Sequence, residues 1–342
     1  MKTIYIHTGQ DKTGTSSLQQ MLFDNRLKLS EENNVSFFTA DMKGRLIKYG
    51  NTCGWIKIDK RNIKNDASIV SPEILAQNLA KLPHDVIMSA ECFSWIFDKK
   101  ELIRFKEELS KFFEKIIIIT YIRRQDKQII SLYQQRSKKR RPPSNFFDDN
   151  ESTAIPTYNK NLDYYFDYNK RISIWGDVFG DDNVIVRVFD KKTLYKGDIV
   201  SDFCNLFNIK NITSSINKNV SNGFEKTKIS HLMSSLGMRN NLRKIINQNL
   251  DNSGKLMPSK EEAKTFYLRY KDSNKKLNER FKINRLENVF DEDFSMYSDF
   301  PMDRWTEESA NQAIIHILQS INDLKALDYF KLGIKSLVKK RR

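Results

Sequence analysis

The chain has 342 residues, of which 39% are apolar and 11% aromatic, which is enough to build a sizeable core and excludes a disordered protein. Lysine and arginine outnumber aspartate and glutamate by 58 to 43, so the formal net charge is +15. This charge favours anionic partners such as nucleotides, acidic glycans, nucleic acid or anionic lipid, and by itself does not choose among them.

The cysteine content indicates the compartment. Only Cys53, Cys92 and Cys204 occur, at wide and irregular spacing, which fits a reducing compartment better than a disulfide framework. No Cys/His cluster has the spacing of a metal site. The first strand starts too early for a signal peptide to precede it, and no apolar run is long enough to cross a bilayer. We therefore expect a soluble, cytoplasmic protein.

Short apolar runs alternate with helical patterns along the first half of the chain. The runs lack clean alternation, as expected for strands buried on both faces of a parallel sheet. This order predicts an α/β fold, a P-loop-like doubly wound parallel sheet flanked by helices. The predicted strands are 3–7, 85–91, 115–124 and 183–189, and the helical patterns are 18–22, 71–82 and 101–115.

The second half of the chain is mostly helical. Beyond about residue 222 the pattern stays helical, with an apolar stripe formed by Ile314, Leu318, Ile321, Leu324 and Leu327 and a basic end, "KKRR". We expect one domain over 1–342, with a nucleotide-binding core over about 1–222 and a helical extension over about 223–342. Two polar segments, 136–153 and 247–262, are predicted to be loops, the first of them a solvated loop or lid.

The first predicted strand leads into "GQDKTGTSSLQQ", residues 9 to 20. Gly9 and Gly14 have the spacing of the two glycines in G-x-x-x-x-G-K-[ST], but the lysine comes earlier, at Lys12. A strand, a glycine turn and a helix bring backbone N–H groups and the positive end of the helix dipole around one point, which suits a phosphate or sulfate. An ordinary turn would not need so many hydroxyl groups, so we favour anion binding. The hydroxyl residues are Thr13, Thr15, Ser16 and Ser17.

This loop resembles the 5′-phosphosulfate loop of sulfotransferases that use 3′-phosphoadenosine 5′-phosphosulfate (PAPS). In that family the lysine precedes the second glycine, as Lys12 does here. The resemblance implies that Lys12 contacts the bridging oxygen and the sulfuryl group, and that the reaction needs no metal. It further implies that the 5′-phosphate is bound by Thr13, Gly14, Thr15, Ser16 and Ser17.

A second motif supports the same resemblance. Sulfotransferases bind the 3′-phosphate through an arginine at the end of a central strand and a serine eight positions later. The segment "YIRRQDKQIISLYQQ" supplies Arg123 and Ser131 at that spacing, directly after "KIIIIT". A guanidinium group forks onto phosphate oxygens through charged hydrogen bonds. Arg124 could take the role given to Arg123.

A base for the acceptor hydroxyl is expected beside the loop, where the family places a histidine or a glutamate. Glu91 ends the predicted strand 85–91 at the carboxyl edge of the sheet, which makes it the candidate general base. It could instead cap a helix or form an ion pair. His7, at the end of the first strand, is the competitor, because histidine titrates in the useful range.

Further likeness is weaker. "VIVRVFDKKTL" resembles the family strand near the adenine, with Phe189 where a tyrosine is common, and "INKNVSNGF" suggests Asn219 and Ser221 as nucleotide contacts. The late R-K-G-x-x-G-x-W-K segment of the cytosolic animal enzymes is missing. This places the chain nearer the bacterial or heparan-type branch.

The implied acceptor is a bacterial capsular or lipopolysaccharide-type glycan. A basic loop, "KKRRPP", and the aromatic cluster of residues 158–171 could grip a sugar polymer, unless that cluster is simply a packed helix. The terminal "VKKRR" suggests contact with a membrane surface, which would make the enzyme peripheral to the inner membrane. Two alternatives remain open: a P-loop kinase of unusual type, which would require Mg²⁺, and a basic nucleic-acid-binding protein.

Overall fold

The computed structural model describes residues 2–58, 67–137, 153–212 and 222–324. The chain divides into two compact units, each made of discontinuous segments. The first unit contains residues 1–128, 159–218 and 267–292, and the second contains 129–158, 219–266 and 293–342. A single domain with a boundary near residue 222 stays a prediction.

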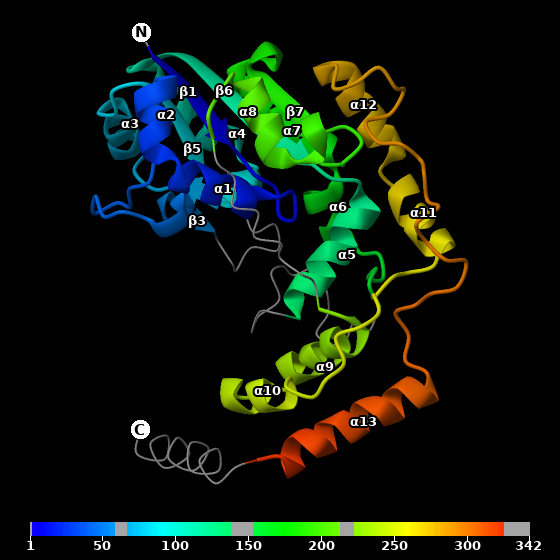
Figure 1. The fold of residues 1–342 in the computed structure, drawn as a ribbon. Helices are drawn as coiled ribbons and strands as arrows, with labels where there is room; N and C mark the ends of the chain where they lie inside the picture. The colour runs from blue at the N-terminus through cyan, green and yellow to red at the C-terminus, as the bar shows by residue number, and fades with distance from the viewer. Residues whose placement is uncertain (1, 59–66, 138–152, 213–221, 325–342) are drawn as a thin grey trace. The chain divides into compact units, whose positions relative to one another are not determined.

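The first unit is built on a five-stranded parallel sheet with the order β2-β5-β1-β6-β7 (Figure 1). All of the predicted strands are present. The short β2 escaped prediction because three residues leave no apolar run to recognise. The strands are β1 (Lys2–His7), β2 (Val35–Phe37), β5 (Asp85–Ser89), β6 (Phe113–Ile122) and β7 (Val184–Val188), and β3 (Ile56–Ile58) and β4 (Ala67–Ile69) form a separate antiparallel pair.

Helices connect the parallel strands, so the fold is the doubly wound α/β sheet that the sequence predicts. β2 and β5, which come first in the sequence after β1, lie on one side of β1 in the sheet. β6 and β7, which follow them, lie on the other side. Ligands of such sheets bind where the winding changes side, at the carboxyl ends of the strands. The helices of this unit are α1 (Thr15–Asp24), α2 (Arg26–Asn33), α3 (Pro72–Ala80), α4 (Lys99–Ser110), the start of α5 (Gln125–Arg136), α6 (Asn161–Phe166), α7 (Tyr168–Phe179), α8 (Ile199–Leu206) and α12 (Lys271–Phe281).

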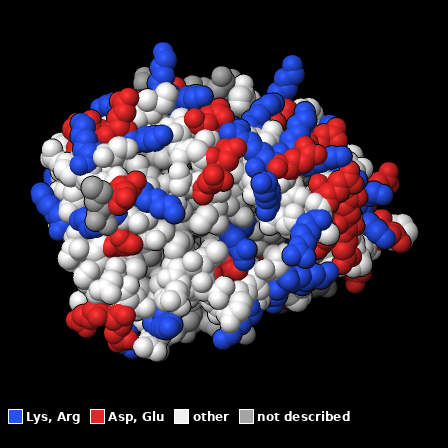
Figure 2. Space-filling view, turned by 90° about the horizontal axis from the view of Figure 1, so that it is seen from above, with Lys and Arg blue, Asp and Glu red and all other residues white. Residues whose placement is uncertain are grey.

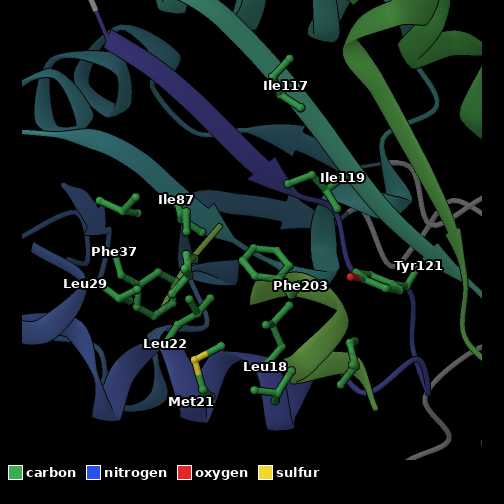
Figure 3. Packing of buried hydrophobic residues seen from close by; sticks show 14 of the residues in the cluster. Leu18, Met21, Leu22, Leu29, Phe37, Ile87, Ile117, Ile119, Tyr121 and Phe203 are labelled. Carbon is green, nitrogen blue, oxygen red and sulfur yellow. The ribbon is translucent and has the colours of Figure 1, made fainter. Parts of the chain in front are cut away.

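One face of the sheet packs against α1, α2 and α8 (Figure 3). Leu18, Met21 and Leu22 project from α1 toward Ile87 of β5 and Ile119 of β6, and all five side chains are buried. Side chains alternate along a strand, so the neighbours of these strand residues face the opposite layer, which contains α4 and α7. Because helices cover both faces of the sheet, side chains on both sides of each strand are buried, and the strands appear in the sequence as continuous apolar runs.

The second unit is helical in the part that the structure describes. Ile229 and Met233 of α9 (Phe224–Ser235) pack with Ile246 of α10 (Asn240–Ile246) and Ala313 of α13 (Glu307–Asn322). The remaining helix, α11 (Lys260–Leu268), runs from this unit into the first. Within the described ranges, each helix is too short or too polar to span a bilayer.

Cys53 and Cys92 form a disulfide, which corrects the expectation of unpaired cysteines. The Cα atoms are 5.4 Å apart although the residues are 39 positions apart in the sequence. The backbone N–H and hydroxyl of Thr52 both donate to the carbonyl of Ser89, at 3.1 and 2.9 Å, and this fixes the two segments side by side. Spacing along the chain could not show this pairing, because the sheet brings the two segments together.

We predict that Cys53→Ser lowers the free energy of unfolding by about 2–4 kcal/mol under non-reducing conditions, because the bridge closes a loop in the unfolded chain. Urea denaturation with and without dithiothreitol measures the change. Dithiothreitol should destabilise the wild type by a similar amount and leave Cys53→Ser unaffected. Equal sensitivity of both proteins to the reductant would contradict the assignment.

Candidate functional site

The loop between β1 and α1 has a strained and closely packed backbone. Gly14 adopts φ +80° at the N-cap of α1, and Lys12 adopts φ +66°. A Cβ atom on Gly14 would lie 2.8 Å from the ring of Phe189 and 3.0 Å from Ile199. Because an L side chain is disfavoured at this φ and would also collide with two neighbours, glycine is required at position 14.

The helix start leaves N–H groups available to an anion. Within α1, the N–H groups of Ser17 and Leu18 donate to the carbonyl of Gly14 at 3.0 and 3.1 Å. The N–H groups that precede them have no acceptor one turn earlier in a helix, and they lie at the positive end of the helix dipole. The first turn contains no acidic residue that could occupy this position. The loop therefore offers the geometry of an anion site.

The hydroxyl groups of the loop fall into two sets. Thr13 and Thr15 are buried, and both hydroxyls donate to the carbonyl of Gln10, at 2.7 and 3.4 Å. Ser16 and Ser17 are exposed at the start of α1. The two threonines thus shape the loop, while the two serines are the hydroxyls accessible to a ligand.

Buried side chains of α5 and α6 form hydrogen bonds with the loop between β1 and α1. The hydroxyl of Tyr165 donates to the Asp11 carboxylate at 3.1 Å, and the side-chain amide of Gln128 donates to the Asp11 carbonyl at 2.8 Å and to the Tyr165 hydroxyl at 3.2 Å. Burial, and secondarily the Asp11 carboxylate, raises the pKa of the Tyr165 phenol well above its usual value. Tyr165 therefore stays a neutral donor that fixes the loop.

Arg123, which follows β6, lies against the same loop. Its Nη1 donates to the carbonyl of Lys12 at 3.3 Å, across 111 positions of sequence, and its guanidinium lies 5.8 Å from the centre of the Phe189 ring. The hydroxyl of Tyr168 donates to the Arg123 carbonyl at 2.7 Å. The structure thus brings Arg123 of the second predicted motif to the loop that contains Lys12.

Arg124 has a different environment. It is buried and forms two hydrogen bonds to the Asp126 carboxylate, at 2.8 and 3.0 Å. Its Nη1 also donates to Asp291 at 3.1 Å. Arg124 therefore forms hydrogen bonds with these carboxylates, whereas Arg123 forms one with the loop between β1 and α1.

The structure does not test the other predicted nucleotide contacts. Ser131 is half-buried on α5 and belongs to the second unit, whereas Arg123 belongs to the first. Asn219 and Ser221 lie outside the described residues. The roles of all three stay predictions.

Glu91 begins a short 3₁₀ turn, Glu91–Trp95, which Ala90 separates from the end of β5. The N–H of Ala90 donates to the carbonyl of His7 at 3.1 Å, which places this turn beside the end of β1, where the loop starts. The hydroxyl of Ser94 donates to the Glu91 carbonyl at 2.7 Å. Glu91 is half-buried and lies at the same edge of the sheet as the loop.

His7 lies in a closed environment. It is fully buried, its Nδ1 contacts the Ser89 hydroxyl at 2.9 Å, and its Nε2 has no hydrogen-bond partner among the described residues. Burial lowers the pKa of His7 to about 3, so the imidazole is neutral at physiological pH. A ligand at this edge therefore cannot reach the His7 side chain, whereas Glu91 is only half-buried.

Sequence reasoning missed the residues that support the loop. Tyr165, Phe166 and Tyr168 are fully buried, so this part of the aromatic cluster 158–171 belongs to the core and does not grip a ligand. No sequence pattern indicated a role for Gln128, because its hydrogen-bond partners Asp11 and Tyr165 are distant in sequence. Among the residues that the structure describes, no group of three or more His, Cys, Asp or Glu is arranged to hold a metal ion.

Comparison with known proteins gives three similarities. No family model matches the chain. An uncharacterized protein of Archaeoglobus fulgidus is 30% identical over 118 residues, which span 34% of this chain and 28% of that protein. A sulfotransferase from Alicyclobacillus acidocaldarius is similar with 15% identity and a TM-score of 0.39, covering 82% of this chain and 96% of the other. Mouse sulfotransferase SULT7A1, in complex with PAP, is similar with 10% identity and a TM-score of 0.30, covering 94% and 85%.

We predict that Gly14→Ala lowers the free energy of unfolding by about 3 kcal/mol, from the disfavoured φ and the collisions with Phe189 and Ile199. Gly44→Ala is the matched control, since Gly44 has φ +73° and open space around its Cβ position, and it should cost only about 1 kcal/mol. Urea denaturation measures both values. Equal costs at the two positions would show that the loop tolerates a side chain.

A second prediction concerns pH. Because the pKa of His7 is lowered on folding, the unfolded chain binds a proton that the folded chain refuses, and stability is lost as pH falls from about 6.5 toward 3. At pH 5 the loss from this residue is about 2 kcal/mol. His7→Asn should flatten the decline in denaturation midpoint over this range. An unchanged slope in His7→Asn would contradict the assignment.

Proposed function

We propose that this protein is a PAPS-dependent sulfotransferase, which moves the sulfuryl group of PAPS to a hydroxyl or amine of an acceptor. The contact between Arg123 Nη1 and the Lys12 carbonyl, at 3.3 Å, carries the proposal. It places a guanidinium group beside a loop built for an anion, and PAPS carries phosphate groups at its 5′ and 3′ positions. One nucleotide would then bind the two motifs at once.

The arrangement of the loop supports one orientation of the nucleotide. The 5′-phosphate would lie at the start of α1, with the N–H groups after Gly14 and the hydroxyls of Ser16 and Ser17 as donors. The 3′-phosphate would bind Arg123. Phe189 lies next to both Gly14 and Arg123, so its ring could pack against the adenine.

The chemistry requires the chain to stabilise the developing negative charge and to remove a proton from the acceptor. PAPS supplies the sulfuryl group. The acceptor oxygen forms a new bond to sulfur in line with the breaking sulfur–oxygen bond, and the bond electrons move to the 5′-phosphate oxygen. Lys12 and the N–H groups of the loop stabilise that negative charge, and Glu91 takes the proton of the acceptor hydroxyl. His7 contributes by holding Ser89 from within the sheet.

Two other functions fit the observations less well. A P-loop kinase would have its lysine directly after the second glycine, where this chain has Thr15, and it would not need Arg123 beside Lys12. A nucleic-acid-binding protein is suggested by the net charge of +15. On the face drawn in Figure 2, however, basic side chains are interspersed with acidic ones and form no uniform basic stripe.

The acceptor and its location complete the proposal. We propose a bacterial capsular or lipopolysaccharide-type glycan as acceptor, because the protein is basic and such polymers often carry acidic groups. A cytoplasmic enzyme in contact with a membrane surface would meet an acceptor carried on a lipid. A reducing cytoplasm would keep Cys53 and Cys92 as two thiols, whereas an oxidising compartment outside it would preserve the disulfide. Thiol labelling of the protein in intact cells therefore distinguishes the proposed cytoplasmic location from an extracytoplasmic one.

The nucleotide site is tested by calorimetric binding of adenosine 3′,5′-bisphosphate in the absence of magnesium. The wild type should bind, and Arg123→Ala should bind roughly 10- to 100-fold more weakly, because a charged hydrogen bond to phosphate is lost. Lys12→Ala should also bind more weakly. Arg104→Ala, which removes a surface arginine paired with Glu73, is the control and should bind normally.

Two outcomes would contradict this prediction. Binding of ATP with magnesium in place of the bisphosphate would favour a kinase. Equal binding of adenosine 5′-monophosphate and of the bisphosphate would mean that the 3′-phosphate has no site at Arg123.

The base is tested separately. Glu91→Gln should lower the turnover number by roughly 10²- to 10⁴-fold and leave the affinity for adenosine 3′,5′-bisphosphate unchanged. The release of the bisphosphate from PAPS, measured with a panel of bacterial capsular polysaccharides as acceptors, gives the rate. Loss of nucleotide affinity together with the rate would place Glu91 in the nucleotide site instead.

A further inference from the structure

Arg171 of α7 is a buried cation that forms no ion pair with the described residues. Only 4% of its surface is exposed. Burial lowers the pKa of the guanidinium, and this effect exceeds the opposing effects of Tyr165, Tyr168 and Asp11. An unbranched apolar side chain such as methionine would fill similar space without the cost of burying a charge. Packing alone therefore does not explain an arginine at this position.

On one side, Arg171 contacts the turn that begins with Glu91. Its Nη2 donates to the carbonyl of Ser94 at 2.6 Å, and its guanidinium lies 5.9 Å from the centre of the Trp95 ring. The hydroxyl of Ser94 donates in turn to the Glu91 carbonyl at 2.7 Å. Arg171 thus fixes the end of the Glu91–Trp95 turn, and Ser94 connects that end to Glu91.

On the other side, Arg171 contacts the residue that supports the loop between β1 and α1. Its Nη1 donates to the carbonyl of Tyr165, and its guanidinium lies 4.5 Å from the centre of the Tyr165 ring. The hydroxyl of that ring donates to the carboxylate of Asp11, the residue before Lys12. Gln10 of the same loop and Arg171 line one small cavity. The same guanidinium therefore contacts the supports of both the loop and the turn.

We infer that Arg171 is a positioning residue, which fixes the proposed base Glu91 relative to the proposed charge-stabilising Lys12. A planar guanidinium suits this role, because its N–H groups point in fixed directions and can donate to two carbonyls at once. In-line transfer requires the acceptor oxygen, the sulfuryl group and the leaving oxygen to be aligned, so the rate depends on how the turn and the loop are placed. The inference rests on the proposed function and adds a residue outside its reacting groups.

The structural link is tested by amide hydrogen exchange, which needs neither nucleotide nor acceptor. Arg171→Met removes the two donors and keeps an unbranched side chain. Exchange should become at least about tenfold faster in residues 8–15 of the loop and in the Glu91–Trp95 turn together. Arg171→Lys keeps the charge but donates from a single nitrogen, so it should loosen both segments to a smaller extent, and it replaces Arg171→Met if that variant does not fold.

Two single changes separate the two sides of the link. Tyr165→Phe removes the hydroxyl that binds Asp11, so it should accelerate exchange in the loop alone. Ser94→Ala removes the hydroxyl that binds the Glu91 carbonyl, so it should accelerate exchange in the turn alone.

The matched control is another buried arginine. Arg243 belongs to the second unit and donates to the carbonyls of Ser137 and Ser230, both at 3.4 Å. Arg243→Met should leave exchange in the loop and in the Glu91–Trp95 turn unchanged. Equal acceleration in Arg243→Met and Arg171→Met would mean that loss of any buried arginine loosens the protein, and would overturn the inference.

The role in transfer is tested by the turnover number with PAPS and the same panel of polysaccharides. Arg171→Met should lower it roughly 10- to 100-fold, because the base is misplaced. Arg171→Lys should restore part of the rate. In the Glu91→Gln background, Arg171→Met should lose most of its effect, since the base that it positions is already absent.

Two results would overturn the inference: faster exchange in only one of the two segments of Arg171→Met, or a fully additive loss of rate in the Glu91→Gln background. Failure of the wild type to bind adenosine 3′,5′-bisphosphate would instead contradict the proposed function. The exchange result does not depend on that binding, so the two failures are distinguishable.

Discussion

The parallel pairing of β1 with β6 is the constraint on which the site depends. In this register His7 lies opposite Ile119, and the N–H of Thr8 donates to the Ile119 carbonyl at 2.9 Å. The two strands therefore end at the same edge of the sheet. β1 leads into the loop that contains Lys12, and β6 is followed directly by Arg123. β5 is also parallel to β1, with Ser89 opposite His7, so Glu91 lies at this same edge. A shift in either register would separate the groups that the proposed reaction needs together.

Buried polar side chains keep the loop rigid without occupying its outer surface. Asp11 is held by Tyr165 and Gln128, while Gln19 donates to the Ser89 hydroxyl at 3.0 Å beneath the loop. Polar groups in such a dry environment are costly unless they are paired, so their mutual hydrogen bonds favour one conformation of the loop. A preorganised set of N–H donors does not need to rearrange when charge develops on a phosphate oxygen. The loop thus has a strained backbone whose conformation is fixed by hydrogen bonds from buried side chains.

The sequence predicted those features that depend on local order. Continuous apolar runs identified β1, β5, β6 and β7, because strands buried on both faces must be apolar throughout. The glycines predicted the turn between β1 and α1, and Arg123 follows β6 as the sequence predicted. The Cys53–Cys92 bridge, the support from Tyr165 and Gln128, and the burial of His7 were not predictable in this way. Each depends on partners far away in sequence, and only the assembled sheet brings those partners together.

The most direct measurement is a crystal structure of the protein with adenosine 3′,5′-bisphosphate. We expect the 5′-phosphate at the start of α1, within hydrogen-bond distance of the N–H groups after Gly14, and the 3′-phosphate against the guanidinium of Arg123. Glu91 should then face the side of the 5′-phosphate from which an acceptor can approach. A nucleotide bound away from Arg123, or with its phosphates reversed between the two strand ends, would contradict the account.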